Sequence, residues 1–112
     1  MNNNNIFHAG DVTPSEAWDI LKKNKEAVLV DVRSSLEWSS VGYPDLKLLG
    51  NKNIKLSWKI YPTWALNNNF VSELVSLVPS KETPLLFICK SGGRSLDAAI
   101  EMARHGYLYS YN

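Results

Sequence analysis

The sequence predicts an α/β fold built on a largely parallel sheet. Two short apolar runs, 27–32 and 85–88, have the composition of strands that are buried on both faces, as in parallel sheets. Helical patterns of apolar residues lie before, between and after these runs. Because strands here alternate with helices, we expect parallel strands joined by helical crossovers.

The first helix is predicted from its capping residues. Thr13 suits the cap, Pro14 suits the first helical position, and Glu16 completes a capping box. Apolar residues at helical spacing follow, and the pattern ends near Asn24. The residues that would face the core are Ala17, Ile20 and Leu21.

The first buried strand, 27–32, ends in charged residues. Asp31 and Arg33 lie at its carboxyl end, where a strand leaves the core. Residues 34–38 then indicate a short capped helical turn, which should stop by the Gly-Tyr-Pro sequence at 42–44.

The pattern is weak between residues 45 and 69. Residues 53–56 alternate like a short strand. Trp58, Tyr61 and Trp64 fall in what we expect to be a long loop. These aromatic side chains could rim a binding surface or simply pack within the loop.

The second half of the chain is more regular. Residues 70–78 have helical spacing and stop before Pro79, and the buried strand 85–88 follows. A longer helix is predicted from 95 to 105, with Gly106 as its carboxyl-terminal cap, and a strand-like segment extends to the end of the sequence.

The composition predicts one ordinary globular domain. The 112 residues are 45% hydrophobic and 21% charged, with a net charge of +1, so nothing indicates binding to nucleic acid or to a membrane. Residues 1–10 form a polar lead-in without the features of a secretory signal, and 11–112 form the domain. A single cysteine cannot form an internal disulfide, which favours a reducing, cytoplasmic location.

That cysteine, Cys89, lies where the second buried strand meets a glycine-containing turn. In α/β sheets, ligands bind at the carboxyl ends of strands, near helix amino termini. Two glycines in the loop 90–94 allow backbone N–H groups to converge, and the helix near Ser95 adds the positive end of its dipole. With the charges of Lys90 and Arg94, these effects should lower the thiol pKa below its free value of about 8.5.

Two other interpretations compete with an activated nucleophile. A free cysteine is often just a buried core residue, and Cys89 taken alone fits that description. The glycines and cations that follow it favour the functional interpretation instead. A phosphate-binding loop of the Walker type does not fit, because the spacing differs.

At these residues the sequence resembles the rhodanese family of sulfurtransferases, in its single-domain form. Residues 89–95, Cys-Lys-Ser-Gly-Gly-Arg-Ser, match that family's Cys-x-x-Gly-x-Arg-Ser active loop. Residues 29–33, with Glu37 and Trp38, resemble its Asp-Val-Arg…Glu segment, and the Gly-Tyr pair at 106–107 is similar too. The resemblance implies a three-layer fold with a mostly parallel sheet flanked by helices.

The resemblance also implies a mechanism. Cys89 would take a sulfane sulfur from a small anionic donor such as thiosulfate, forming a persulfide. A thiol, cyanide or a protein acceptor would then remove it. No metal or organic cofactor is implied. Lys90 would contact the donor, and the persulfide would be cradled by the loop formed by Lys90, Ser91, Gly92, Gly93, Arg94 and Ser95.

Supporting roles follow for the charged residues near this loop. Arg94 could face the donor, or it could pair with Asp31 or Glu37 and brace the loop; its place at the helix start favours bracing. Asp31 and Arg33 are expected to orient the site, and Glu37 to anchor the loop rather than act as a general base.

The sequence departs from the family pattern in two places. Residues 42–45 replace the usual Gly-His-Ile-Pro-Gly-Ala, and a longer aromatic insertion follows, so the substrate side of the site should differ. The family normally continues past the last strand into a Gly-Gly turn and a further helix, whereas this sequence stops at Asn112. The chain is therefore either a fragment or a fold without that last helix, with apolar sheet surface exposed.

Other functions with a similar loop are less well supported. Dual-specificity phosphatases and arsenate reductases have five residues between cysteine and arginine, whereas four separate Cys89 from Arg94. The smaller cradle suits one sulfur rather than a tetrahedral oxyanion. A non-catalytic rhodanese-like module for protein interaction or regulation is the main alternative.

Overall fold

The computed structural model describes residues 9–40, 49–89 and 93–112. Most of the polar lead-in, the 42–45 departure and the loop residues Lys90, Ser91 and Gly92 therefore lie outside the described residues.

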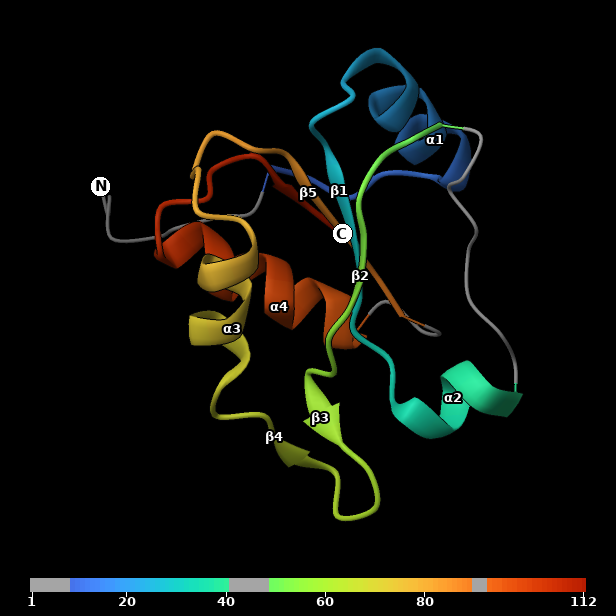
Figure 1. The fold of residues 1–112 in the computed structure, drawn as a ribbon, viewed down its shortest axis with the longest axis vertical. Helices are drawn as coiled ribbons and strands as arrows, with labels where there is room; N and C mark the ends of the chain where they lie inside the picture. Colours follow the sequence, from blue (N-terminus) through green and yellow to red (C-terminus); the bar gives the residue numbers. More distant parts are fainter. Residues whose placement is uncertain (1–8, 41–48, 90–92) are drawn as a thin grey trace.

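A parallel sheet forms the centre of the molecule (Figure 1). Its strand order is β2-β1-β5-β6, and every described pairing in it is parallel. The strands are β1 (Val28–Asp31), β2 (Asn53–Lys55), β5 (Leu85–Ile88) and β6 (Ser110–Tyr111). The predicted fold class is confirmed, and the two apolar runs form the two central strands.

Helices cover both faces of this sheet. Figure 1 shows α1 (Pro14–Lys23) on one side, and α3 (Phe70–Leu77) with α4 (Gly93–Arg104) on the other. Side chains alternate along β1, so that Val28 and Val30 join the α3/α4 core while Leu29 joins the α1 core. Burial on both faces explains why these strands are continuously apolar.

The predicted capping box opens α1. The Thr13 hydroxyl accepts a hydrogen bond from the Glu16 N–H at 3.1 Å, and the Glu16 carboxylate accepts one from the Thr13 N–H at 2.8 Å. The helix ends at Lys23, and the Asn24 N–H still bonds to the Ile20 carbonyl.

The end of α4 explains why the last strand is shorter than predicted. Gly106 has φ +97°, and the N–H groups of Gly106 and Tyr107 bond to the carbonyls of Ala103 and Met102. This pattern is a Schellman motif. Because the Tyr107 backbone completes the helix end and its buried hydroxyl donates to the Val78 carbonyl, pairing in β6 begins only at Ser110.

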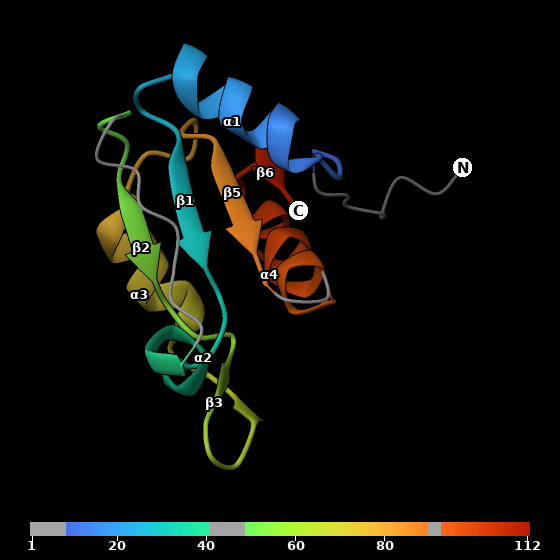
Figure 2. The same ribbon diagram turned by 90° about the vertical axis from the view of Figure 1, so that its right-hand side faces the viewer.

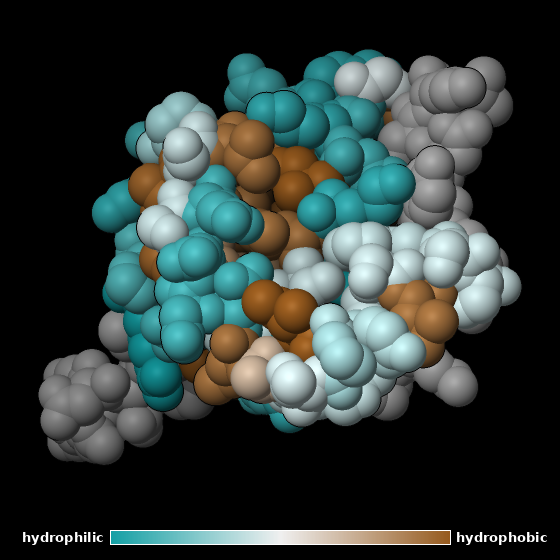
Figure 3. Space-filling model, turned by 60° about the horizontal axis from the view of Figure 1, so that its bottom comes forward, coloured by the Kyte–Doolittle hydropathy of each residue, from teal (hydrophilic) through white to brown (hydrophobic). Residues whose placement is uncertain are grey.

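The segment expected to be a long loop contains a β-hairpin. Strands β3 (Lys59–Ile60) and β4 (Ala65–Leu66) pair antiparallel and extend from the bottom of Figure 1. Tyr61 and Trp64 contact each other edge to face across the turn, with ring centroids 5.6 Å apart. Viewed from this end, the surface in Figure 3 carries apolar patches that lie between strongly hydrophilic residues and residues of intermediate hydropathy.

The three aromatic residues of this segment divide between core and surface. Trp58 is half-buried and packs edge-on against Phe70, with ring centroids 5.0 Å apart. Tyr61 and Trp64 are each 44% exposed. Packing therefore accounts for Trp58, whereas the other two rings lie on the surface.

Candidate functional site

The candidate site lies where neighbouring parallel strands end. Asp31 and Ile88 are paired at the ends of β1 and β5, and the Val32 N–H donates to the Ile88 carbonyl at 3.1 Å, so Cys89 leaves β5 at the end of the sheet where the chain leaves β1. Figure 2 shows the three longest strands pointing toward this edge, where α2 (Ser35–Ser40) lies and α4 begins. Ligands bind at this edge in open α/β sheets.

Cys89 is held against the first turn of α4. Its Sγ lies 3.3 Å from the Ser95 backbone nitrogen, which donates to it, and 3.3 Å from the Ser95 hydroxyl oxygen. The thiol is half-buried and packs against the α3/α4 core. A helix N–H directed at sulfur, with the positive end of the helix dipole behind it, favours negative charge on that sulfur.

Arg94 and Glu37 form a two-pronged ion pair. The two terminal nitrogens of Arg94 donate to the two carboxylate oxygens of Glu37 at 2.7 and 3.0 Å. Both side chains are about one-fifth exposed. Of the two acidic residues considered from the sequence, Arg94 pairs with Glu37, and the pair ties the start of α4 to α2.

Ser34 completes the environment of Glu37. Both its backbone N–H and its hydroxyl donate to one Glu37 oxygen at 3.0 Å. The hydrogen bonds from Arg94, and then those from Ser34, lower the pKa of Glu37 from 4.5 to about 2, against an opposing effect of burial. The same pair raises the pKa of Arg94. Glu37 is therefore an anion at neutral pH and is fully engaged as an anchor.

Asp31 is fully buried and pairs with Arg33 rather than Arg94. The Arg33 Nε and a terminal nitrogen donate to the two Asp31 oxygens at 2.9 and 2.7 Å, and the Arg33 backbone N–H adds a third bond at 3.1 Å. This hydrogen bonding raises the pKa of Arg33. The arrangement neutralises a buried carboxylate and fixes the chain as it leaves β1.

Comparisons with known proteins agree with this geometry. The sequence profile of the family described as "Rhodanese-like domain" matches residues 13–112. The chain belongs to the rhodanese-like domain family. In the solved structures, the crystal structure of Rv0390 from M. tuberculosis matches with a TM-score of 0.85 and 42% sequence identity, over 94% of this chain and 76% of that one.

Two bacterial proteins are similar to this chain over most of its length. The uncharacterized protein RC0915 of Rickettsia conorii is 39% identical over 103 residues, which is 91% of this chain and 78% of the relative. The uncharacterized protein RP600 of Rickettsia prowazekii gives the same identity and coverage.

Within this rhodanese-like domain, the sequence-predicted site residues are only partly described. The structure brings Cys89 and Ser95 into contact and joins Arg94 to Glu37, whereas Asp31 and Arg33 form a separate pair at the same edge. Lys90, Ser91 and Gly92 lie outside the described residues, so a contact of Lys90 with the donor stays a prediction.

Sequence reasoning missed Asn112. The Ser95 hydroxyl donates to the Asn112 side-chain oxygen, and the Asn112 amide nitrogen donates to the Asp11 carboxylate at 3.1 Å. Backbone bonds of 3.0 Å to Gly10 and 2.9 Å from Val12 hold Asn112 beside the segment that precedes α1. No local pattern marks this residue, because its partners are about 17 and 101 positions away.

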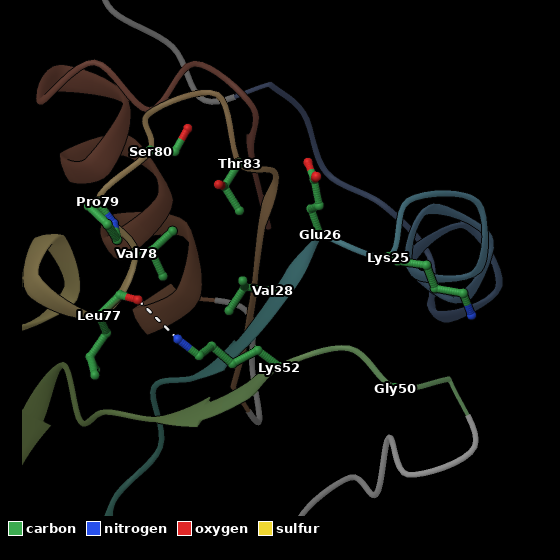
Figure 4. Close-up of a pocket in the computed structure, with 10 residues that line it drawn as sticks. All are labelled: Lys25, Glu26, Val28, Gly50, Lys52, Leu77, Val78, Pro79, Ser80 and Thr83. Carbon is green, nitrogen blue, oxygen red and sulfur yellow. Dashed lines mark hydrogen bonds between the residues drawn. The ribbon is translucent and has the colours of Figure 1, made fainter.

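A hollow lies at the end of the sheet opposite to the candidate site (Figure 4). Its volume is about 360 Å³, and the Lys52 ammonium reaches across it to the Leu77 carbonyl at 3.0 Å. Lys25 bonds to the Leu49 carbonyl at 3.0 Å. Each of these lysines therefore donates to a backbone carbonyl at the rim of the hollow.

Among residues 9–40, 49–89 and 93–112, no group of three His, Cys, Asp or Glu side chains is placed to hold a metal ion. No helix in the described part of the chain has the length and apolar character needed to cross a membrane.

Proposed function

We propose that this rhodanese-like domain is a sulfurtransferase that carries a sulfane sulfur as a persulfide on Cys89. The observation that carries the proposal is the hydrogen bond from the Ser95 backbone N–H, at the amino terminus of α4, to the Cys89 Sγ. A thiolate is the nucleophilic form of cysteine, and this environment favours it.

The reaction has two displacement steps. The Cys89 thiolate attacks the outer sulfur of a donor such as thiosulfate; a new S–S bond forms, the donor S–S bond breaks, and sulfite leaves with the electron pair. An acceptor nucleophile then attacks the outer persulfide sulfur, which breaks the bond to Cys89 and restores its thiolate. With cyanide as the acceptor, the product is thiocyanate.

The loop residues 90–95 would supply hydrogen bonds to the anionic outer sulfur, with Lys90 meeting the donor charge. Arg94 has a different role, because Glu37 already engages both of its terminal nitrogens. It positions the start of α4, together with Glu37. Asp31 and Arg33 hold the neighbouring strand end in place.

The pairing of the Arg94 guanidinium with Glu37 argues against a phosphatase function. Recognition of a phosphate by arginine requires its fork of N–H donors. Since that fork in Arg94 is directed at Glu37, the geometry favours sulfur transfer over phosphate hydrolysis. The donor class is a small sulfur anion, and the acceptor is cyanide, a thiol or a protein thiol. A lone cysteine that must stay reduced supports a reducing, cytoplasmic location for this activity.

Intact mass measured before and after incubation with thiosulfate tests the proposal. We expect a gain of one sulfur atom, reversed by cyanide and absent in Cys89→Ser. Circular dichroism of both proteins controls for folding. A folded parent chain that gains no sulfur would overturn the proposal and favour a non-catalytic interaction module.

A further inference from the structure

Four side chains form a continuous hydrogen-bonded series that ends at the cysteine. The Cys89 thiol donates to the Ser95 hydroxyl oxygen at 3.3 Å, and that hydroxyl donates to the Asn112 Oδ1. The Asn112 Nδ2 then donates to Asp11 at 3.1 Å. The series joins the first turn of α4 to the residue after β6 and to the segment before α1.

The direction of each bond follows from what each group can donate. An ionised carboxylate only accepts, so Asp11 orients the Asn112 amide with its nitrogen toward Asp11 and its oxygen toward Ser95. A serine hydroxyl carries one proton, and here that proton goes to Asn112. The hydroxyl oxygen is then an acceptor toward sulfur, which suits a protonated thiol and not a thiolate.

We propose that Asn112 is a positioning residue that holds the Ser95 hydroxyl proton away from Cys89, which partly offsets the stabilisation of the thiolate by the Ser95 N–H and the amino terminus of α4. Asp11 supports this role by fixing the amide orientation. When the thiolate forms, the hydroxyl must turn from Asn112 to the sulfur, and the Asn112 oxygen gives up that donor. The inference concerns the nucleophile of the proposed sulfurtransferase and rests on that function only for its role in turnover.

Other charged groups also act on the thiol. Arg94 on α4 interacts with the charge of Cys89 and favours the thiolate, while Glu37 on α2 offsets part of that charge. Asp31 and Arg33 at the end of β1 form their own pair. These groups would remain in place in a variant at position 112, so their contribution cancels in a comparison of that variant with the parent.

The test measures the thiol pKa from the pH dependence of Cys89 alkylation by iodoacetamide. Asn112→Leu keeps the branching and the number of side-chain heavy atoms but removes the acceptor, so the Ser95 hydroxyl can donate to the thiolate instead. We expect the thiolate fraction below the pKa to rise by about three- to tenfold. Asp11→Asn, which removes the charge that orients the amide, should shift it in the same direction by a smaller factor.

The matched control places Asn112→Leu in a Ser95→Ala background. Without the hydroxyl there is no proton to redirect, so the Asn112 substitution should then leave the thiol pKa unchanged. An unaltered or raised pKa in Asn112→Leu, or a shift that persists in the Ser95→Ala background, would overturn the inference. If Asn112→Leu fails to fold, the same two outcomes are read from Asp11→Asn.

Alkylation needs no sulfur donor, so the two proposals can fail separately. A shifted thiol pKa in a chain that never gains sulfur from thiosulfate would refute the proposed function and leave the role of Asn112 intact. A chain that gains sulfur normally, with the same thiol pKa in parent and variants, would refute the role of Asn112 alone.

Discussion

Glu37 has two structural tasks at once. Its carboxylate accepts hydrogen bonds from Ser34, the residue before α2. It also accepts hydrogen bonds from both terminal nitrogens of Arg94 on α4. Replacing its carboxylate with a neutral amide would leave the Arg94 charge without a partner beside the thiol. The position therefore couples the stability of the domain to the geometry of the candidate site.

Glu37→Gln should reduce stability at neutral pH by about 2 kcal/mol and flatten its acid dependence. The pKa of Glu37 is lowered from 4.5 to about 2, so its carboxylate stabilises the fold above pH 4.5 and loses that effect as the pH falls toward 2. Urea unfolding of both proteins across this range measures the difference. Glu73→Gln, on an exposed part of α3, is the charge-matched control; equal acid profiles for the parent and Glu37→Gln would contradict the prediction.

Site residues that lie close together in a recognisable motif could be predicted from the sequence, whereas those with distant partners could not. Cys89 and Arg94 share one short loop with recognisable chemistry, and the acidic partner of Arg94 could be narrowed to two residues. Asn112 could not be found in this way, because an asparagine after a short strand has no distinctive pattern. Its link to Ser95 exists only once β6 lies beside β5.

The end of α4 is an element whose stability depends on one backbone conformation. Gly106 adopts φ +97°, where a side chain is disfavoured whatever the surrounding space. We expect Gly106→Ala to lower the free energy of unfolding by about 1 kcal/mol. Gly106→Asn should cost less, because asparagine tolerates this region better. Thermal and urea unfolding compare them; an alanine variant as stable as the parent would contradict the prediction.

The helix ends could be predicted because local residues specify them, whereas no such residues mark the hairpin. Thr13, Glu16 and Gly106 are residues whose local chemistry specifies a helix terminus. The β3–β4 turn instead places Trp64 at φ 61°, a conformation usually given to glycine or asparagine. The turn contains Pro62, but with tryptophan at the left-handed position it has no distinctive hairpin pattern, so the hairpin could not be predicted from the sequence.

At the scale of the molecule, the buried apolar residues of the described ranges form two clusters, one on each face of the parallel sheet. Leu21 belongs to the core under α1, and Leu74 to the core under α3 and α4. Leu21→Val and Leu74→Val should each destabilise the fold by about 1 kcal/mol. Because the two sites share no partner across the sheet, the double variant should show the sum within about 0.5 kcal/mol.

Urea unfolding of the parent, the two single variants and the double variant measures this additivity. A coupling energy well above that tolerance would mean that the sheet transmits packing changes between its faces. The additive result would show that each core can be altered without disturbing the other.

The strand order also determines when the site can exist during folding. The central pair joins positions 31 and 88, and the series that reaches Cys89 draws on positions 11 and 112. Such long-range pairings close large loops and form slowly compared with local structure. We therefore expect the contact of the Cys89 sulfur with Ser95 to be available early, because it is local, and the link onward to positions 112 and 11 to form late, once the sheet has assembled.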